Sequence, residues 1–458
     1  MASSMIDSAL YRNSFGTPEM REIFDDRSMM ANMLAIEIAM TEVQGELGLI
    51  PADAVKEIVS KGKVENMDFA AIESEINRIG HSLVPLIRYW QKICTGGAGE
   101  YIHLGATTQD IIDTAFMLCY KKAFAVIYND ACEAEEHCLA LVKKYKDTVM
   151  AGRSHTQQAI PITFGFKAAV WASELRRDIE RLQECWKRCF VGELYGAVGT
   201  LASFGENGLH IAEESIRRVG LDVPDIAWHV SRDRIGEIVT TLGLLCCTMG
   251  RIGKEIASLQ KTEIGELAEG FTPGAVGSST MPHKRNPNGP EAMQMLARAV
   301  KSSMDFSMES MFCEHERDGA FWKLEWKAVA DTIIMAGACI AKGKKVLKNL
   351  DVFPEAMKEN LYKLRGLMMS EKVMLALGKI VGKQTAHEIV YQISMKSFEQ
   401  KRDFGELLMA NETIATHFTK EQIDKLLDPA AYTGESAFLA ERVYGRSMAA
   451  RQNDLVIA

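Results

Sequence analysis

The stretch that decides the fold is residues 235–256, which read IGEIVTTLGLLCCTMGRIGKEI. Its apolar residues recur at steps of three and four positions, and the set is Ile235, Val239, Leu242, Cys246, Met249 and Ile256. Such steps place side chains on one face of an α-helix, because the helix makes one turn in about 3.6 residues. The stretch therefore predicts a long helix whose apolar face packs against another helix.

Long helices are expected along most of the 458-residue chain, because only 11 prolines interrupt it. The segments 111–148, 164–190 and 326–348 are rich in Ala, Met, Leu and Lys and lack the alternation typical of strands. The sequence thus predicts an all-α fold built on a central bundle of long helices. Continuous apolar stripes of this length often pair between subunits as well, so we expect a homo-oligomer, with a monomeric bundle as the alternative.

The charge balance argues against nucleic acid as a partner. Lys and Arg number 53 and Asp and Glu number 61, for a net charge of -8, and no basic stretch is dense enough to follow a phosphate backbone. Residues 1–16 contain no apolar signal segment, and the most apolar stretch, 332–341, is too short to cross a bilayer. We therefore expect a cytoplasmic protein without a membrane partner.

The cysteines predict neither disulfides nor a metal. All 10 are scattered without the spacing of a disulfide scaffold, so we expect reduced thiols. Cys185 and Cys189 are one helical turn apart, but no second Cys or His pair follows at ligand spacing. No GxGxxG after a strand and no P-loop occurs either. We expect no metal and no cofactor.

Glycine, threonine and proline gather at 96–108, 192–208 and 270–289, which we expect to be loops that carry function. The third leads into GSSTMPHKRNPNGPE at 277–291. Its hydroxyls and backbone amides can bind an anion, while Lys284 supplies a charge and Asn286 a directional donor. A carboxylate substrate would suit this segment, and a solvated surface loop is the alternative.

Two more polar clusters lie beside predicted helices. In GRSHTQQ at 152–158, His155 could be a general acid or base because the imidazole of histidine titrates near neutral pH, with a structural histidine as the alternative. Thr107 and Thr108 precede a predicted helix, whose N-terminus attracts anions. They could bind a carboxylate, or they could cap the helix together with Asp110.

Taken together, the three clusters resemble the fumarase/aspartase superfamily. The segment 277–291 matches the superfamily signature GSSxMPxKxNPxxxE at every fixed position, and GATTQDIIDTA at 105–115 and GRSHTQQAIPITFG at 152–165 are similar to its other two blocks. The similarity runs from about Phe15 to Arg446. It is closest to the branch that holds the 3-carboxy-cis,cis-muconate cycloisomerases and the adenylosuccinate lyases.

The resemblance implies a three-domain, almost all-α subunit. It implies an N-terminal helical domain at 1–110, a central long-helix bundle at 111–360 with a catalytic loop at 270–290, and a C-terminal helical domain at 361–458. It also implies a homotetramer in which three subunits contribute to each active site. The chemistry in such enzymes uses protein groups alone.

The same resemblance implies roles for individual residues. Ser278 is the implied base that removes a proton from the carbon beside a carboxylate, and Lys284 and Asn286 stabilise the carbanion. His155 is the implied acid that protonates the leaving group, and Glu291 orients its ring. The other implied substrate contacts are Thr107, Thr108, Ser154, Gln157, Ser279, Arg317 and His81.

Departures from the adenylosuccinate lyases narrow the substrate. The positions that hold a nucleotide phosphate in those enzymes correspond here to Ser14, Phe15, Trp322 and Trp326. Indole rings cannot neutralise a phosphate dianion, so adenylosuccinate is disfavoured. The segment EHER at 314–317 looks most similar to the cycloisomerases, whereas the retention of His155 favours elimination over lactone formation.

We therefore expect a lyase that splits a substituted succinate by anti β-elimination and releases fumarate. The leaving group is expected to be a small amine or thiol, as in a succinyl amino acid or S-(2-succino)cysteine, with a polar head resting against Trp322 or Trp326. The first alternative is 3-carboxy-cis,cis-muconate cycloisomerase, and adenylosuccinate lyase is less favoured. Outside enzymes, the alternative is an inactive structural relative.

Overall fold

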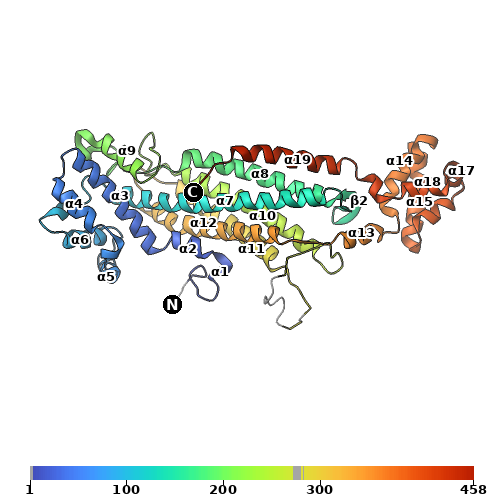
Figure 1. Cartoon of the computed structure of the whole chain (residues 1–458), viewed down its shortest axis with the longest axis horizontal. Coiled ribbons are helices and arrows are strands. Elements are labelled where there is room, and N and C mark those ends of the chain that lie inside the picture. Colours follow the sequence, from blue (N-terminus) through green and yellow to red (C-terminus); the bar gives the residue numbers. More distant parts are fainter. Residues whose placement is uncertain (1–3, 272–279, 282, 458) are drawn as a thin grey trace.

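The computed structural model describes residues 4–271, 280, 281 and 283–457. These residues are mostly helical, which confirms the predicted all-α class. A bundle of long helices lies along the long axis of the molecule (Figure 1). Its members are α7 (Thr108–Tyr145), α8 (Phe164–Cys189), α10 (Asp233–Leu259), α11 (Asn288–Met308) and α12 (Gly319–Lys348).

Residues 235–256 lie within α10, and the predicted apolar face is buried. Its most exposed member, Ile235, is only 1% exposed. Glycines let α10 approach α11 closely: a Cβ on Gly243 would lie 2.5 Å from Sδ of Met304, and one on Gly250 would lie 2.6 Å from Cβ of Ala297. Close approach of two helices needs small residues at the contact, because side chains otherwise set the distance between the axes.

α10 also corrects one expectation about apolar segments. Among the described residues it is the one helix long and apolar enough to cross a membrane by length and composition. The sequence had been expected to contain no apolar stretch of that length. Of its most apolar stretch, 61% is buried inside the protein. Helices at the centre of a protein core reach such hydrophobicity without any lipid.

The N-terminal helices α3 to α6 gather at one end of the bundle, while α1 and α2 lie against α12 (Figure 1). Side-chain caps begin several of them, because Thr17, Asp25 and Asp68 each accept a hydrogen bond from a backbone N–H in the first turn of their helix. The helices are α1 (Arg12–Phe15), α2 (Pro18–Ile23), α3 (Asp26–Glu46), α4 (Ala52–Lys61), α5 (Phe69–Ile79), α6 (Val84–Ile93) and, beside α3, α9 (Gly208–Arg218).

The C-terminal helices form a cluster at the opposite end, with a core of its own around Leu377, Phe404 and Ile414 (Figure 1). They are α14 (Ser370–Val381), α15 (Lys383–Gln400), α16 (Phe404–Met409), α17 (Glu412–His417) and α18 (Lys420–Leu426). The helix before them, α13 (Pro354–Tyr362), packs against the strand Val149–Ser154. The chain then returns as α19 (Ser436–Ala450), which packs along α8 and α7. The predicted boundaries after 110 and 360 stay predictions.

Two short antiparallel pairs of strands interrupt the helices. β1 (Val149–Ser154) and β2 (Gln157–Thr163) form a hairpin between α7 and α8, and β3 (Leu267–Ala268) pairs with β4 (Asp351–Val352). The hairpin lies at the end of the bundle that faces the C-terminal helices (Figure 1). Its position matters because the predicted acid His155 lies in its turn.

Candidate active site

The N-terminus of α7 carries the first predicted cluster. Thr107 and Asp110 form a capping box, in which Oδ2 of Asp110 accepts a hydrogen bond from the Thr107 backbone N–H at 2.9 Å. Asp110 is fully buried and also accepts from the backbone amides of Tyr195 and Gly196 at 3.1 and 3.0 Å. The predicted cap is therefore formed by Thr107 and Asp110, and Thr108 takes no part in it.

Arg317 reaches the same helix end from the segment before α12. Its Nη1 donates to Oγ1 of Thr107 at 2.7 Å, and its Nε donates to Oε1 of Gln109 at 3.1 Å. The Thr107 hydroxyl uses its oxygen as an acceptor here, so its proton stays available to another acceptor. The structure thus brings two predicted substrate contacts, Thr107 and Arg317, into direct contact.

His81 joins this group through Thr108. The Val84 backbone N–H donates to Nδ1 of His81 at 3.1 Å, so the neutral ring carries its proton on Nε2, which lies 3.4 Å from Oγ1 of Thr108. Burial, and then the charge of His103, lower the pKa of His81 and favour that neutral form. The Thr108 hydroxyl can therefore accept from His81 and donate its own proton to a ligand.

A buried charge cluster behind Arg317 was missed by the sequence analysis. Nη1 of Arg232 donates to Oδ2 of Asp113 at 2.7 Å, and Nε of Arg232 donates to Oε2 of Glu325 at 2.8 Å. All three side chains are at most 2% exposed.

Trp322 also belongs to this cluster, because its Nε1 donates to Oδ1 of Asp113 at 2.6 Å, and it is only 8% exposed. Trp322 is thus a buried hydrogen-bond donor, which corrects the expectation that its ring could support a substrate group.

His103 is a second residue that the sequence analysis did not single out. It has a positive φ of 66°, and its Nδ1 lies 2.6 Å from Oε1 of the buried Glu37. Burial opposes the charged form of His103, but the Glu37 carboxylate outweighs burial and raises the pKa of His103. A positive φ at a residue other than glycine is uncommon, so the backbone conformation marks this position. The conformation is visible only in the structure, and no pattern in the sequence indicates it.

The predicted acid His155 lies in the tight turn between β1 and β2. His155 and Thr156 have φ values of 48° and 66°, and the flanking Ser154 and Gln157 pair as strand residues. Positive φ at both central residues is the conformation of a two-residue hairpin turn. All four residues of the turn are exposed, so His155, Ser154 and Gln157 lie at the surface of the chain.

A buried ion pair anchors the hairpin that carries His155. Nη1 and Nη2 of Arg153 donate to the two carboxylate oxygens of Glu266 at 2.9 and 2.7 Å, and Glu266 is fully buried. Nδ2 of Asn360 donates to the same carboxylate at 2.7 Å. Because Glu266 directly precedes β3, this cluster joins the hairpin to the start of the segment that leads toward Ser278.

Ser278 and Ser279 lie outside the described residues. Lys284 is exposed and Asn286 is half-buried on the approach to α11, and Glu291 lies exposed in the first turn of that helix. Within the described part of the chain, no hydrogen bond or ion pair joins Glu291 to His155. The predicted orientation of His155 by Glu291 is therefore not formed within one chain.

Two side chains hold the ends of the segment around Ser278 together. Oε1 of Gln260 accepts from the Glu269 backbone N–H at 2.9 Å, while its Nε2 donates to the Arg285 carbonyl oxygen at 3.2 Å. The Glu269 carboxylate accepts from the Gly289 backbone N–H at 2.8 Å. These bonds fix the chain on both sides of Lys284 and Asn286.

The two groups of predicted residues lie far apart within one chain. Thr107 and Thr108 are at the start of α7, whereas the hairpin with His155 follows its end (Figure 1). α7 contains 38 residues, which at about 1.5 Å each corresponds to roughly 55 Å. No side-chain movement spans that length, so one chain by itself does not bring these residues to one substrate.

Two groups of side chains in the described chain have the spacing of metal ligands: Asp110 with Glu193 and His229, and Cys185 with Cys189 and Glu237. Both groups already have partners. Asp110 accepts from backbone amides and lies 2.9 Å from Nε2 of His229, and Glu237 receives the guanidinium of Arg188. Both groups fit structural networks better than metal sites.

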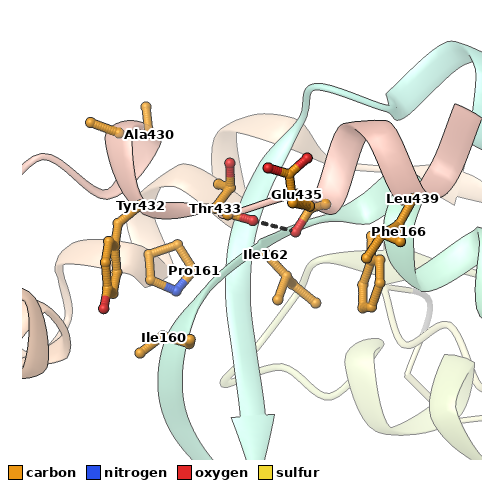
Figure 2. A pocket seen from close by; sticks show the side chains of 12 residues that line it. Ile160, Pro161, Ile162, Phe166, Ala430, Tyr432, Thr433, Glu435 and Leu439 are labelled. Atoms are coloured by element: carbon orange, nitrogen blue, oxygen red, sulfur yellow. Dashed lines mark hydrogen bonds between the residues drawn. The ribbon is translucent and has the colours of Figure 1, made fainter.

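One cavity lined by described residues contains none of the predicted catalytic residues. It has a volume of about 700 Å³ and lies between β2 and the start of α19, as Figure 2 shows. Its walls are mainly apolar, with Pro161 and Tyr432 toward one end and Phe166 and Leu439 toward the other. The hydroxyl of Ser436 is already bonded to the Thr433 carbonyl oxygen at 2.6 Å. Glu435 is the one carboxylate among the residues that line this cavity, and no histidine, lysine or cysteine accompanies it there.

Comparisons with known proteins agree with this fold and these residues. Residues 12–301 match a family model described as Lyase, and residues 366–443 match one described as Adenylosuccinate lyase C-terminus. The chain therefore belongs to the fumarase/aspartase superfamily of lyases and is an enzyme of that superfamily.

Particular relatives are similar over nearly the whole chain. N-acetyl-S-(2-succino)cysteine lyases of Dickeya dadantii (strain 3937) and Enterococcus italicus are each 42% identical, and the alignments cover 95% and 97% of this chain and 96% and 97% of those relatives. The crystal structure of 3-carboxy-cis,cis-muconate lactonizing enzyme from Pseudomonas putida aligns with a TM-score of 0.91 at 31% identity, over 96% of this chain and 99% of that one.

Proposed function

We propose that this enzyme releases fumarate from an S-(2-succino) derivative of cysteine, with the N-acetylated form as the preferred substrate. The single observation that carries the proposal is the group of donors at the N-terminus of α7, where Arg317 contacts Thr107 and both threonine hydroxyls have a proton to donate. Such a group suits a carboxylate of a succinyl unit. The name of the two relatives at 42% identity supports the choice of substrate.

The proposed reaction is an anti β-elimination. Ser278 removes the proton from the carbon beside one carboxylate, and the electron pair forms a carbanion that Lys284 and Asn286 stabilise. The pair then forms the double bond of fumarate as the carbon–sulfur bond breaks. The thiolate leaves with the electrons of that bond and takes a proton from His155, which yields N-acetylcysteine.

The leaving group determines how much the acid contributes. A thiol has a pKa of about 8.5, so a thiolate can leave with little help from an acid, whereas an amine must be protonated before it leaves. His155→Ala should therefore reduce kcat modestly for the succinothiol and by about 100-fold for an N-succinyl amino acid. Equal losses for both substrates would argue against His155 as the acid.

The proposed active site is completed by neighbouring subunits. The roughly 55 Å length of α7 separates the two groups of residues within one chain. The bundle also leaves large apolar side chains exposed on α8, α10 and α11, namely Val170, Leu244, Met295 and Phe306. Exposed apolar side chains on the faces of long helices fit association into the homotetramer that the resemblance implies.

A cycloisomerase acting on 3-carboxy-cis,cis-muconate is the second candidate. The specific observation in its favour is the close structural alignment with the lactonizing enzyme, at a TM-score of 0.91. Lactone formation closes a ring on a diene and releases no fumarate. Loss of the ultraviolet absorbance of the diene on addition of enzyme would therefore distinguish it from the proposed lyase.

The test is fumarate release from a panel of substrates by the purified protein. The panel holds N-acetyl-S-(2-succino)cysteine, S-(2-succino)cysteine, N-succinyl amino acids, argininosuccinate and adenylosuccinate. Ser278→Ala should abolish release, and Ser302→Ala, on an exposed face of α11, serves as the matched control. The proposal fails if the succinothiols yield no fumarate while another member of the panel does.

A further inference from the structure

The Arg317 guanidinium is held along one side and open along another. Its Nε and Nη1 donate to Gln109 and Thr107, and Nη2 makes no hydrogen bond to the described residues. A guanidinium offers five N–H donors in a planar fork, and its Nη1–Nη2 edge can take both oxygens of one carboxylate. The edge that faces a ligand therefore depends on what holds Nε.

Gln109 can present only its oxygen to Arg317. Its Nε2 donates to Oδ2 of Asp113 at 3.1 Å and to the carbonyl oxygen of His229 at 2.9 Å. Both partners accept hydrogen bonds and cannot donate them, so the amide nitrogen must face them and Oε1 must face Arg317. Gln109 is 1% exposed, which leaves no room for water to take over either bond.

Asp113 is in turn fixed by the buried cluster of Arg232, Glu325 and Trp322. Arg232 donates to both Asp113 and Glu325, and Trp322 donates to Asp113. The cluster holds two carboxylates against one guanidinium, so its excess negative charge lies behind Gln109. That charge favours the cationic Arg317 at the front of Gln109.

We propose that Gln109 is a positioning residue, which turns the Nη1–Nη2 edge of Arg317 toward a carboxylate of the substrate. The inference rests on the proposed function, in which Arg317 binds that carboxylate. Without Oε1 of Gln109 the guanidinium is free to turn its Nε edge to the ligand. Ligand binding then weakens, while the chemical step, carried by other residues, changes less.

The experiment compares Gln109→Leu, Arg317→Ala and the double variant in the full-length protein. Fumarate binding is measured by calorimetry, and kcat and KM are measured for fumarate release. We expect Gln109→Leu to weaken fumarate binding and raise KM about tenfold, as for one hydrogen bond to a charged group, with kcat changed less than about threefold. The double variant should bind no more weakly than Arg317→Ala alone.

Gln183→Leu is the matched control. Gln183 also donates from Nε2 to two acceptors, Tyr128 and Asp454, but it lies on α8 away from Arg317. It should lower the unfolding midpoint as Gln109→Leu does and leave fumarate binding unchanged. Should Gln109→Leu fail to fold, Gln109→Met, which is closer in shape, takes its place.

The outcomes separate this inference from the proposed function. Unchanged fumarate binding in Gln109→Leu overturns the inference, and so do additive losses in the double variant. If the wild type binds fumarate but cleaves no succinothiol, the proposed function fails while the binding comparison still tests Gln109. A wild type that binds no dicarboxylate overturns both.

Discussion

Replacing Arg153 with methionine should destabilise the protein strongly, because it leaves the fully buried Glu266 carboxylate without its charged partner. The two hydrogen bonds lost are 2.9 and 2.7 Å long, and the bond from Asn360 reaches only one of the carboxylate oxygens. Orphaning one member of a buried ion pair costs about 3–5 kcal/mol. The loss should appear as a lower urea midpoint in far-ultraviolet circular dichroism at fixed protein concentration.

The reverse change, Glu266→Met, should cost less. The Arg153 side chain is 16% exposed and keeps its hydrogen bond to the Ala151 carbonyl oxygen at 3.2 Å, so water can solvate part of its charge. We expect a loss smaller by about 1–2 kcal/mol. Arg188→Met is the control, since that arginine pairs with Glu237 while 59% exposed, and such pairs contribute about 0–1 kcal/mol. The reasoning is refuted if Arg153→Met costs under about 1 kcal/mol or less than Glu266→Met.

Three further outcomes are expected. Gly250→Ala should lower the unfolding free energy by about 1–3 kcal/mol because its Cβ would lie 2.6 Å from that of a facing alanine, whereas Gly445→Ala, with no atom within 4 Å, should raise it slightly in the same urea assay. Burial opposes the charged form of His103, but Glu37 raises the pKa of His103. The contribution of this pair to the free energy of unfolding is therefore complete below about pH 6.5 and is lost as the pH rises through the folded-state pKa. The difference between the urea midpoints of wild type and His103→Gln should therefore shrink as the pH rises above about 6.5. Thr108→Val should raise KM for fumarate release about tenfold with a smaller effect on kcat, and an unchanged KM would exclude the Thr108 hydroxyl from substrate binding.

The sequence predicted the helices better than it predicted their contacts. The apolar period of residues 235–256 predicted α10 because burial on one face is a local pattern. The close approach at Gly243 and Gly250 depends on which residues of α11 face them, and the period of one helix does not contain that information. The hairpin of β1 and β2 was also missed, because its turn is made by His155 and Thr156 in place of the usual glycine or asparagine.

The candidate site could be predicted only where its residues are close together in the sequence. Thr107 and Thr108 stood out as adjacent hydroxyls before a helix, and the structure places Arg317 against Thr107. Asp113, Arg232 and Glu325 come from three different helices or their ends, so only folding brings their charges together. The sequence around each of them does not show that the three charges are buried together.

The length of α7 has a genetic consequence. In the proposed assembly, one subunit supplies the Thr107 end and another the His155 end of the same active site. With an N-succinyl amino acid as substrate, an enzyme altered at Arg317 and one altered at His155 would each be strongly impaired alone. Mixed within one oligomer, they should rebuild about a quarter of the sites with both ends intact, since each end is sound in half of the subunits. Two damaged copies of the gene could therefore restore activity that neither provides by itself.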